Sequence, residues 1–108
     1  MEENFRTNII VKDKIRSGQG VDFFGMPANP GTCYGVTKSA GYKGEWADIE
    51  TFGTIKNVIP GEVIKKGDKI NFKNGFVCKC ADNEPIAGYA LQDADEKAEY
   101  ISIFKTGV

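Results

Sequence analysis

Three cysteines are the residues of this sequence best suited to chemistry, because a thiolate can bind a soft metal or act as a nucleophile. Cys78 and Cys80 are one residue apart, so both side chains would face the same side of an extended strand, like half of a zinc site. The sequence contains no histidine, and Cys33 is one thiol where two further ligands would be needed. We therefore interpret all three as small apolar side chains in a reducing compartment, and expect no metal and no cofactor.

Two other stretches contain residue types that bind ligands. Asp93, Asp95 and Glu96 are close together, but their run lacks the glycine and the terminal glutamate of a calcium loop, which favours a solvated loop. The stretch GMPANPG (residues 25–31) is interpreted as a rigid surface connection, with a ligand-binding loop as the alternative. Without histidine, a serine or cysteine nucleophile would need an unusual base, so we expect that the protein is not an enzyme.

Length and charge narrow the class of protein and its partners. A chain of 108 residues, 41% hydrophobic and 27% charged, is typical of one compact domain with a single core. Fourteen basic and fifteen acidic residues, without a long run of either sign, indicate no nucleic-acid partner. No apolar run approaches the roughly 18 residues of a membrane span, so we expect no membrane partner. The start, MEENFRTNII, has acidic residues where a secretory signal has basic ones, which predicts retention in the cytoplasm of the cell that makes it.

The elements that would position these residues are short strands. Thirteen glycines recur where the apolar alternation breaks, and helical stripes are hard to find. The pair Asn74-Gly75 is a strong hairpin signal, and residues 91–100 are either one helical turn or a polar loop. We expect about seven to nine strands, including strands within VDFF (21–24), EWADIETFGTI (45–55), KINFKNGFVCKC (69–80) and EYISIFKTGV (99–108).

One sequence motif occurs twice in the chain. KIRSGQGVDF (residues 14–23) and VIKKGDKINF (63–72) align so that Phe23 corresponds to Phe72. The stretches that follow also match, with Trp46 equivalent to Tyr100. The sequence therefore consists of a β unit of about 50 residues that is used twice.

The duplication has a physical reason. A unit of three or four strands buries one face and leaves two open edges, so two units are expected to close on each other. We predict an all-β fold, a small closed β-barrel or sandwich of the β-tulip type, built from two pseudo-repeated units. It would form a single domain, residues 1–108, with an extended N-terminal arm of about 1–13 and halves of about 14–58 and 59–108.

The second half carries a pattern of structural glycines and aliphatic residues. Its members are Gly61, Ile64, Gly67, Asp68, Ile86, Gly88, Ala90, Leu91, Asp93, Ala94, Ile101, Ile103, Gly107 and Val108. This pattern resembles the small capsid decoration, or cement, proteins of tailed bacteriophages. A weaker first copy, also typical of that family, lies at residues 15–23 and 35–55. It departs from the family at Gly18-Gln19, where Gly-Asp is usual, and in the insertion NPGTCYG.

The resemblance implies a non-enzymatic role in the virion. Such proteins bind the outer surface of an assembled phage head at junctions between major capsid subunits and stabilise the head. The implied partner is the major capsid protein, and the implied assembly is a homotrimer on the capsid surface. A small β-barrel module that binds a ligand or carbohydrate is the alternative, and a carrier domain or an accessory subunit of an enzyme follows well behind.

The N-terminal segment is one candidate for capsid contact. An extended arm could add a strand to an open edge of a capsid protein, and an ordinary first strand of the barrel is an equally weighted alternative. The candidate contact residues are Asn4, Phe5, Arg6, Thr7, Asn8, Ile9 and Ile10.

Aromatic residues of the first half form a second candidate interface. Tyr34, Tyr42 and Trp46 belong to residue types that dominate binding energy at protein interfaces. Phe52 is expected to lie in the core. The equivalence of Trp46 and Tyr100 favours a shared structural role for both, and so counts against Trp46 as an interface anchor.

Overall fold

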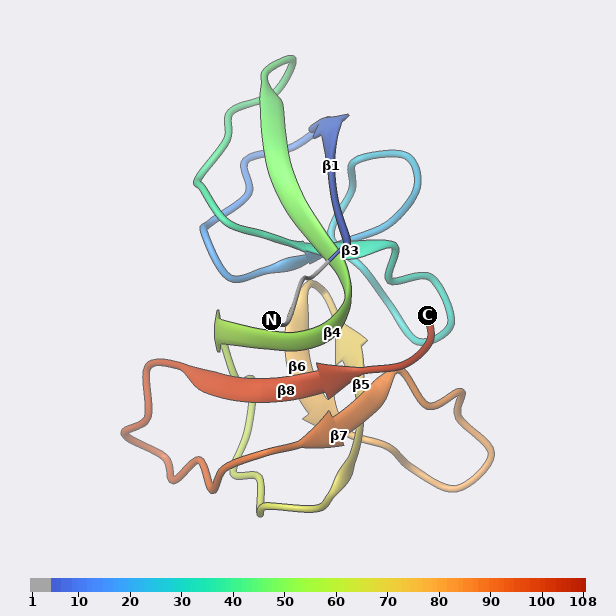
Figure 1. Ribbon diagram of the computed structural model, residues 1–108, viewed down its shortest axis with the longest axis vertical. Coiled ribbons are helices and arrows are strands. Elements are labelled where there is room, and N and C mark those ends of the chain that lie inside the picture. Colours follow the sequence, from blue (N-terminus) through green and yellow to red (C-terminus); the bar gives the residue numbers. More distant parts are fainter. Residues whose placement is uncertain (1–4) are drawn as a thin grey trace.

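The computed structural model describes residues 5–108, which contain only strands and loops (Figure 1). The strands are β1 (Phe5–Ile10), β2 (Gly20–Val21), β3 (Gly35–Thr37), β4 (Trp46–Val58), β5 (Lys69–Lys73), β6 (Phe76–Lys79), β7 (Gly88–Ala90) and β8 (Ile101–Lys105). They form one sheet in the order β2-β3-β4-β8-β7-β5-β6, and β1 pairs separately with β4. Residues 5–108 include no helix long and apolar enough to cross a membrane.

The sheet curls into a nearly closed barrel because its ends meet through short backbone contacts. Beyond β4, Pro60 pairs with Val77 of β6, and the Val77 N–H donates to the carbonyl oxygen of Ile59 at 3.0 Å. At the other end, the Gly20 N–H of β2 donates to the carbonyl oxygen of Gly75, in the β5–β6 turn, at 2.8 Å. The predicted small all-β barrel is confirmed.

The long strand β4 belongs to both halves of the barrel. Its residues 46–52 pair with β1, and β3 lies along the opposite edge of this part. Residues 53–58 pair instead with β8. Gly53, at the boundary, has a φ of 90°, which a residue with a side chain rarely adopts. Figure 1 shows β4 bending sharply at its middle, so that one strand serves two neighbouring sheets.

The two halves make the same backbone hydrogen bonds at equivalent positions. Ile15 and Gly41 exchange two bonds of 2.9 Å. Ile64 and Ala94, at the corresponding places of the second half, exchange bonds of 2.9 and 2.8 Å. The repeated motif therefore specifies the same local structure twice.

The turn after each bridge is closed by one side chain. Asp68 Oδ2 accepts a hydrogen bond from the Lys65 N–H at 2.9 Å, and Gln19 Oε1 accepts one from the Arg16 N–H at 2.7 Å. Gln19 is the residue at which the first copy departs from the Gly-Asp pattern. The longer amide side chain makes the same contact as the shorter carboxylate, so this departure preserves the turn.

Two apolar clusters fill the interior. The larger includes Ile55, Ile70, Phe72, Val77 and Ile103, and the smaller includes Val11, Ile15, Val21 and Ile49. Phe72 is fully buried and its ring lies against Gly20, where an added Cβ would overlap it. The largest aromatic ring of the core therefore packs directly on the backbone of the other half.

Most of the predicted strands are present, and one is wrong over part of its length. The hairpin at Asn74-Gly75 is confirmed, with φ values of 51° and 86° that are typical of a type I′ turn. Residues 91–100 form a loop and not a helical turn. The strand predicted for residues 21–24 ends at Val21, because Asp22 begins a tight turn.

Candidate interaction surface

A tight turn of residues 22–26 places two phenylalanines at the surface. Asp22 Oδ1 accepts hydrogen bonds from the N–H groups of Phe24 and Met26 at 2.8 and 2.9 Å, and the Asp22 N–H donates to the Met26 carbonyl oxygen at 2.8 Å. Phe23 is 58% exposed and Phe24 is 76% exposed. Because these bonds fix the backbone, the turn presents its apolar side chains in a defined position.

The same turn is attached to the end of β1. The Lys12 N–H donates to the Gly25 carbonyl oxygen at 2.9 Å. Gly25 has a φ of 84°, and a Cβ at this position would overlap the carbonyl oxygen of Ile10. Only glycine allows this backbone approach, so turn 22–26 lies directly beside β1.

β1 carries the residues that were predicted to contact a capsid. Ile9 is buried and Ile10 is half-buried. Asn4 lies outside the described residues, so its predicted contact stays a prediction. The segment from Phe5 is a strand paired with β4, and its four exposed residues are Phe5, Arg6, Thr7 and Asn8.

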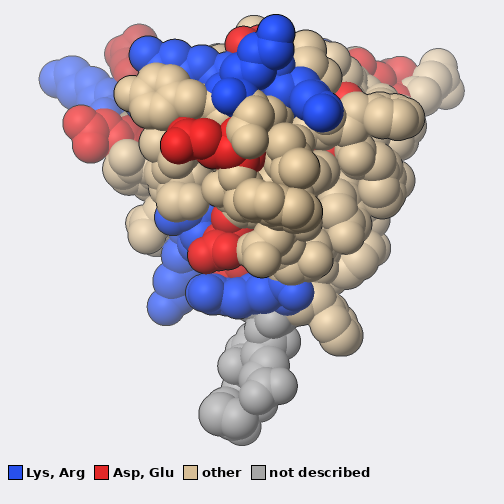
Figure 2. All heavy atoms as spheres, turned by 90° about the horizontal axis from the view of Figure 1, so that it is seen from above, with Lys and Arg blue, Asp and Glu red and all other residues tan. Residues whose placement is uncertain are grey.

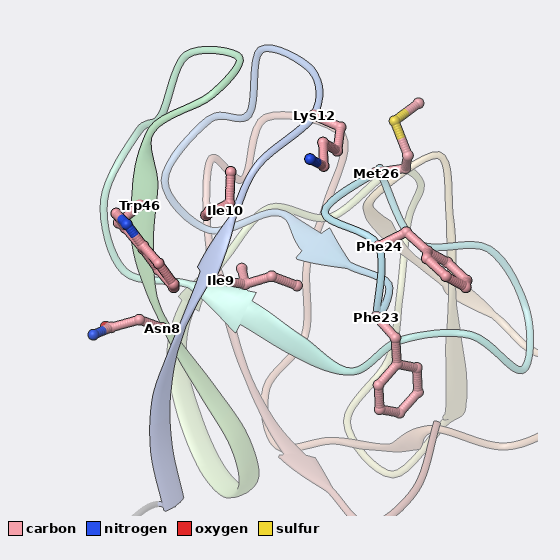
Figure 3. Close-up of a pocket in the computed structure, with 8 residues that line it drawn as sticks. All are labelled: Asn8, Ile9, Ile10, Lys12, Phe23, Phe24, Met26 and Trp46. Atoms are coloured by element: carbon pink, nitrogen blue, oxygen red, sulfur yellow. The ribbon is translucent and has the colours of Figure 1, made fainter.

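A shallow hollow of about 480 Å³ lies along the edge of β1. Figure 3 shows Ile9 pointing from β1 toward the loop that carries Phe23, while Asn8 and Trp46 lie on the other side of the strand. The hollow is lined by Asn8, Ile9, Ile10, Lys12, Phe23, Phe24, Met26 and Trp46.

A second hollow, of about 340 Å³, lies nearer the start of β1. It is lined by Phe5, Thr7, Tyr34, Thr51 and Phe52. The Tyr34 ring stacks on Phe23, with ring centroids 4.5 Å apart, and so connects the linings of the two hollows. We call the resulting surface the aromatic face, and its members are Phe5, Phe23, Phe24, Met26, Tyr34, Trp46 and Phe52.

The structure places two of the three predicted interface aromatics beside β1, each in the lining of a different hollow. Tyr34 and Trp46 belong to the aromatic face, whereas Tyr42 is 63% exposed and lines neither hollow. The Lys14 ammonium lies 5.9 Å from the Tyr42 ring centroid. Phe52, expected in the core, is 38% exposed. That core expectation is wrong because Phe52 is in phase with the exposed Trp46 and Asp48 in the alternation of β4. The buried Lys105 ammonium lies 4.6 Å from the centroid of its ring.

Lys105 and Cys33 are ionisable groups buried under the aromatic face. The Lys105 side chain, 1% exposed, donates to the Gly107 carbonyl oxygen at 2.5 Å, and burial lowers its pKa. Burial raises the pKa of the Cys33 thiol to about 12. Cys33 therefore stays protonated at neutral pH, where a thiol is unreactive.

Charged groups also lie beside β1. The buried Glu50 carboxylate of β4 pairs with Arg6 at 3.4 Å and with Lys38 at 3.1 Å. Figure 2 shows basic and acidic side chains mixed together on the side seen from above, with a broad uncharged area next to them. The mixed charge agrees with the net charge of −1 and favours an uncharged contact surface over a strongly charged one.

The second half also exposes aromatic side chains. Tyr89 of β7 and Phe104 of β8 are directly paired across the two strands. They are 39% and 42% exposed. This pair provides a matched control surface for experiments on the aromatic face.

Sequence reasoning missed Phe23, Phe24 and Met26 as interface residues. A signal for them was present, because adjacent side chains of a strand face opposite sides and both phenylalanines of VDFF could not be buried by one core. The glycine and proline that follow indicate a turn directly afterwards.

No protein-family model matches the sequence, and no curated protein matches it. Among solved structures, the fold is similar to one described as "head fiber gp8.5 N base in bacteriophage phi29", with a TM-score of 0.76 and 19% sequence identity. The match covers 96% of this chain and 95% of that chain. At this identity the likeness establishes a shared fold, which extends over nearly all of both chains.

Proposed function

We propose that this protein is a structural component of a phage head, which binds the outer surface of the capsid at junctions between major capsid subunits and stabilises the head. The observation that carries the proposal is the fold shared, over 96% of the chain, with a domain described as the N base of a phage head fiber. The sequence pattern from Gly61 to Val108 supports it independently, because it resembles phage decoration proteins. The proposed role is structural and not catalytic.

The aromatic face supplies a surface for such binding. Soluble monomers rarely expose large contiguous apolar patches unless these patches bind a partner. Trp46 and Phe24 are 67% and 76% exposed, and aromatic side chains of this kind contribute most of the energy at protein interfaces. The nearly closed barrel beneath them provides a rigid support.

The proposed assembly is a homotrimer on the capsid surface. Three linked copies would convert weak single contacts into strong binding, because each further contact forms at a high effective concentration. Light scattering coupled to size-exclusion chromatography tests this part, and the expected mass is three times 11.8 kDa. A monomeric mass would contradict a trimer in solution.

Binding to heads tests the function itself. Heads of the phage that encodes this chain, prepared without the protein, would be mixed with increasing amounts of it and sedimented. We expect saturable binding to expanded heads, at a fixed ratio to the major capsid protein that the lattice sets. Absence of the protein from the pellet, or uptake that never saturates, would contradict the proposal.

A ligand-binding module is the second candidate, because Trp46 lines a hollow of about 480 Å³. Aromatic side chains beside a concave site are typical of small-molecule and carbohydrate binding. A glycan array distinguishes the two functions. Selective glycan binding that the change Trp46→Ala abolishes, without binding to heads, would favour the module.

A further inference from the structure

One edge of β1 is not paired with any other strand that the structure describes. β1 forms its ladder with β4 along the opposite edge. An unpaired strand edge presents N–H and C=O groups that another extended chain can pair with. Natural proteins usually cover such edges, so the uncovered length of β1 calls for an explanation.

Two hydrogen bonds just beyond β1 define the directions of its backbone groups. The Val11 N–H donates to the Glu45 carbonyl oxygen at 2.9 Å, toward the β4 side. The next residue, Lys12, donates its N–H to Gly25 at 2.9 Å, toward the opposite side. Turn 22–26 therefore covers this edge from Ile10 onward and leaves the part from Phe5 to Ile9 open.

The alternation of a strand extends these directions back along β1. Successive residues point their backbone groups to opposite edges, so Thr7 and Ile9 face β4 while Arg6 and Asn8 face outward. The far edge of β4 agrees, since the Asp48 carbonyl oxygen accepts from the Lys38 N–H on the β3 side, which leaves Ala47, the partner of Ile9, facing β1. The N–H and C=O groups of Arg6 and Asn8 are thus directed at a position where a further strand would lie.

The surroundings of this edge determine the chemistry of a bound chain. The two hollows adjoin β1, and the first is lined both by residues of β1 and by Phe23 and Phe24 of the loop next to it, which Figure 3 labels. All the residues that line the two hollows are uncharged except Lys12. Lys12 is exposed and forms no ion pair with another residue in the range 5–108. We call the open edge together with the two hollows the β1 groove.

We propose that the β1 groove binds an extended segment of a partner polypeptide, which pairs with the outward backbone groups of Arg6 and Asn8, places apolar side chains in the hollows and sets a carboxylate against Lys12. Strand addition of this kind takes affinity from main-chain bonds and specificity from side-chain pockets. The inference rests on the proposed function for the identity of the partner, which is then a segment of the major capsid protein.

The test uses variants that change only the outer edge. Asn8→Pro removes an outward N–H without removing a β1–β4 bond, because proline is tolerated on the solvent side of an edge strand. Asn8→Ala is the matched control, because it removes the same side chain and keeps the N–H. We expect Asn8→Pro to weaken binding to expanded heads by about 10-fold, the loss of one hydrogen bond, and Asn8→Ala by less than about 3-fold. Equal binding by the two variants would overturn the inference.

A second measurement stays valid if Asn8→Pro fails to fold. Trp46 is the single tryptophan of the chain and lines the first hollow, so its fluorescence reports occupancy. The full-length protein would be titrated with overlapping peptides that cover the major capsid protein. We expect a peptide containing an acidic residue to shift the Trp46 emission to shorter wavelength, and the changes Lys12→Glu and Phe24→Ser each to weaken that binding. The absence of any such peptide would contradict the inference.

The outcomes separate this inference from the proposed function. Saturable binding to heads that Asn8→Pro leaves unchanged, with no binding peptide, would overturn the groove and leave the capsid role in place. Peptide binding without binding to heads would overturn the capsid role. A fall in the solution mass of Asn8→Pro would assign the groove to a second copy of the chain. Binding to phosphatidylserine vesicles that depends on Phe24 would assign the face to a membrane, and both of these results contradict the inference.

Discussion

Residues 21–34 and 70–87 occupy equivalent places in the two halves and have different structures. Each segment returns to the barrel through the same bond, from the Tyr34 N–H to Val21 and from the Ala87 N–H to Ile70, both at 2.8 Å. In the second half the chain continues straight as β5, and Phe72 is fully buried. In the first half the strand stops, and the equivalent Phe23 is 58% exposed.

One residue type accounts for the difference. Asp22 accepts two backbone hydrogen bonds and closes a turn, whereas the equivalent Asn71 lies within β5 and donates from its side chain to Glu84 Oε1 at 3.1 Å. The hydrogen bonds of Asp22 therefore end the strand in the first half, although both halves have the same apolar pattern. The same position of the duplicated unit is therefore a buried core residue in the second half, Phe72, and an exposed residue in the first half, Phe23.

The largest expected effect is on the buried member of the phenylalanine pair. Phe72→Ala removes the ring that packs on Gly20, and we expect it to lower the free energy of unfolding by about 3–5 kcal/mol. Phe23→Ala is expected to cost less than about 1 kcal/mol, because the ring is mostly in water. Urea unfolding of both variants measures this. Similar losses in the two variants would show that Phe23 contributes to the core.

A smaller effect is expected where turn 22–26 meets β1. Gly25→Ala should lower the free energy of unfolding by roughly 2–4 kcal/mol, because the strain of a positive φ is added to overlap with Ile10. Gly44→Ala is the matched control, since Gly44 has a φ of 90° and open space around it. Its cost should be only about 1 kcal/mol. If both changes cost the same, the turn is not packed against β1.

The cysteines of the two segments allow a pH experiment. Because burial raises the folded pKa of Cys33 from 9.0 to about 12, the protonated thiol stabilises the folded state below pH 9, and this stability is lost as the pH rises from 9 toward 12. Between pH 8 and pH 10, urea midpoints should show a loss of stability that is larger by roughly 1 kcal/mol in the native protein than in Cys33→Ala, which keeps the raised pKa values of Cys78 and Cys80.

Lys105 acts in the opposite direction, but it affects both proteins of this pair. Burial lowers its pKa from 10.5, so its contribution to stability rises with pH until the unfolded group also loses its proton. The difference between the native protein and Cys33→Ala therefore reports the thiol together with its charge interaction with Lys105. A thiol reagent gives a second readout, since half-buried Cys80 should react before Cys33 does. Rapid reaction of Cys33 in the folded protein would contradict its burial.

The smallest expected effects are at the matched turns before β2 and β5. Gln19→Ala and Asp68→Ala each remove one acceptor for a backbone N–H, so each should cost about 1 kcal/mol. Thermal or urea unfolding of the two variants side by side measures the comparison. A loss confined to Asp68→Ala would show that the first copy of the turn no longer depends on its side chain.

Much of the fold could be predicted because its signals are local. The hairpin at Asn74-Gly75 and the alternation of Ile101 and Ile103 depend on neighbouring residues alone, and both are present. The exposure of Phe23 could not be predicted from the alignment of the two halves, because that alignment matches Phe23 with Phe72, which is buried. The side-chain bonds of Asp22, together with Gly25 and Pro27 after it, distinguish the two positions.

The interaction surface was predictable only in part, because it is assembled from distant segments. The segment from Phe5 could be an arm or a strand from sequence alone, since its partner β4 lies about forty residues farther along the chain. Tyr34 and Trp46 were selected by residue type, and their meeting with turn 22–26 depends on the backbone contact at Gly25. The partial exposure of Phe52 agrees with the alternation of β4, in which Phe52 is in phase with the exposed Trp46 and Asp48.

The most direct test of the central claim is a sedimentation assay of two double variants with expanded phage heads, the partner that the proposed function names. One variant, Phe23→Ser with Phe24→Ser, removes exposed aromatic side chains of the first half. The other, Tyr89→Ser with Phe104→Ser, removes the exposed pair of the second half. We predict that the first double variant loses binding by at least about 10-fold, equivalent to about 1.4 kcal/mol, while the second binds like the native protein. Equal binding by both double variants, or loss only in the second, would contradict the account.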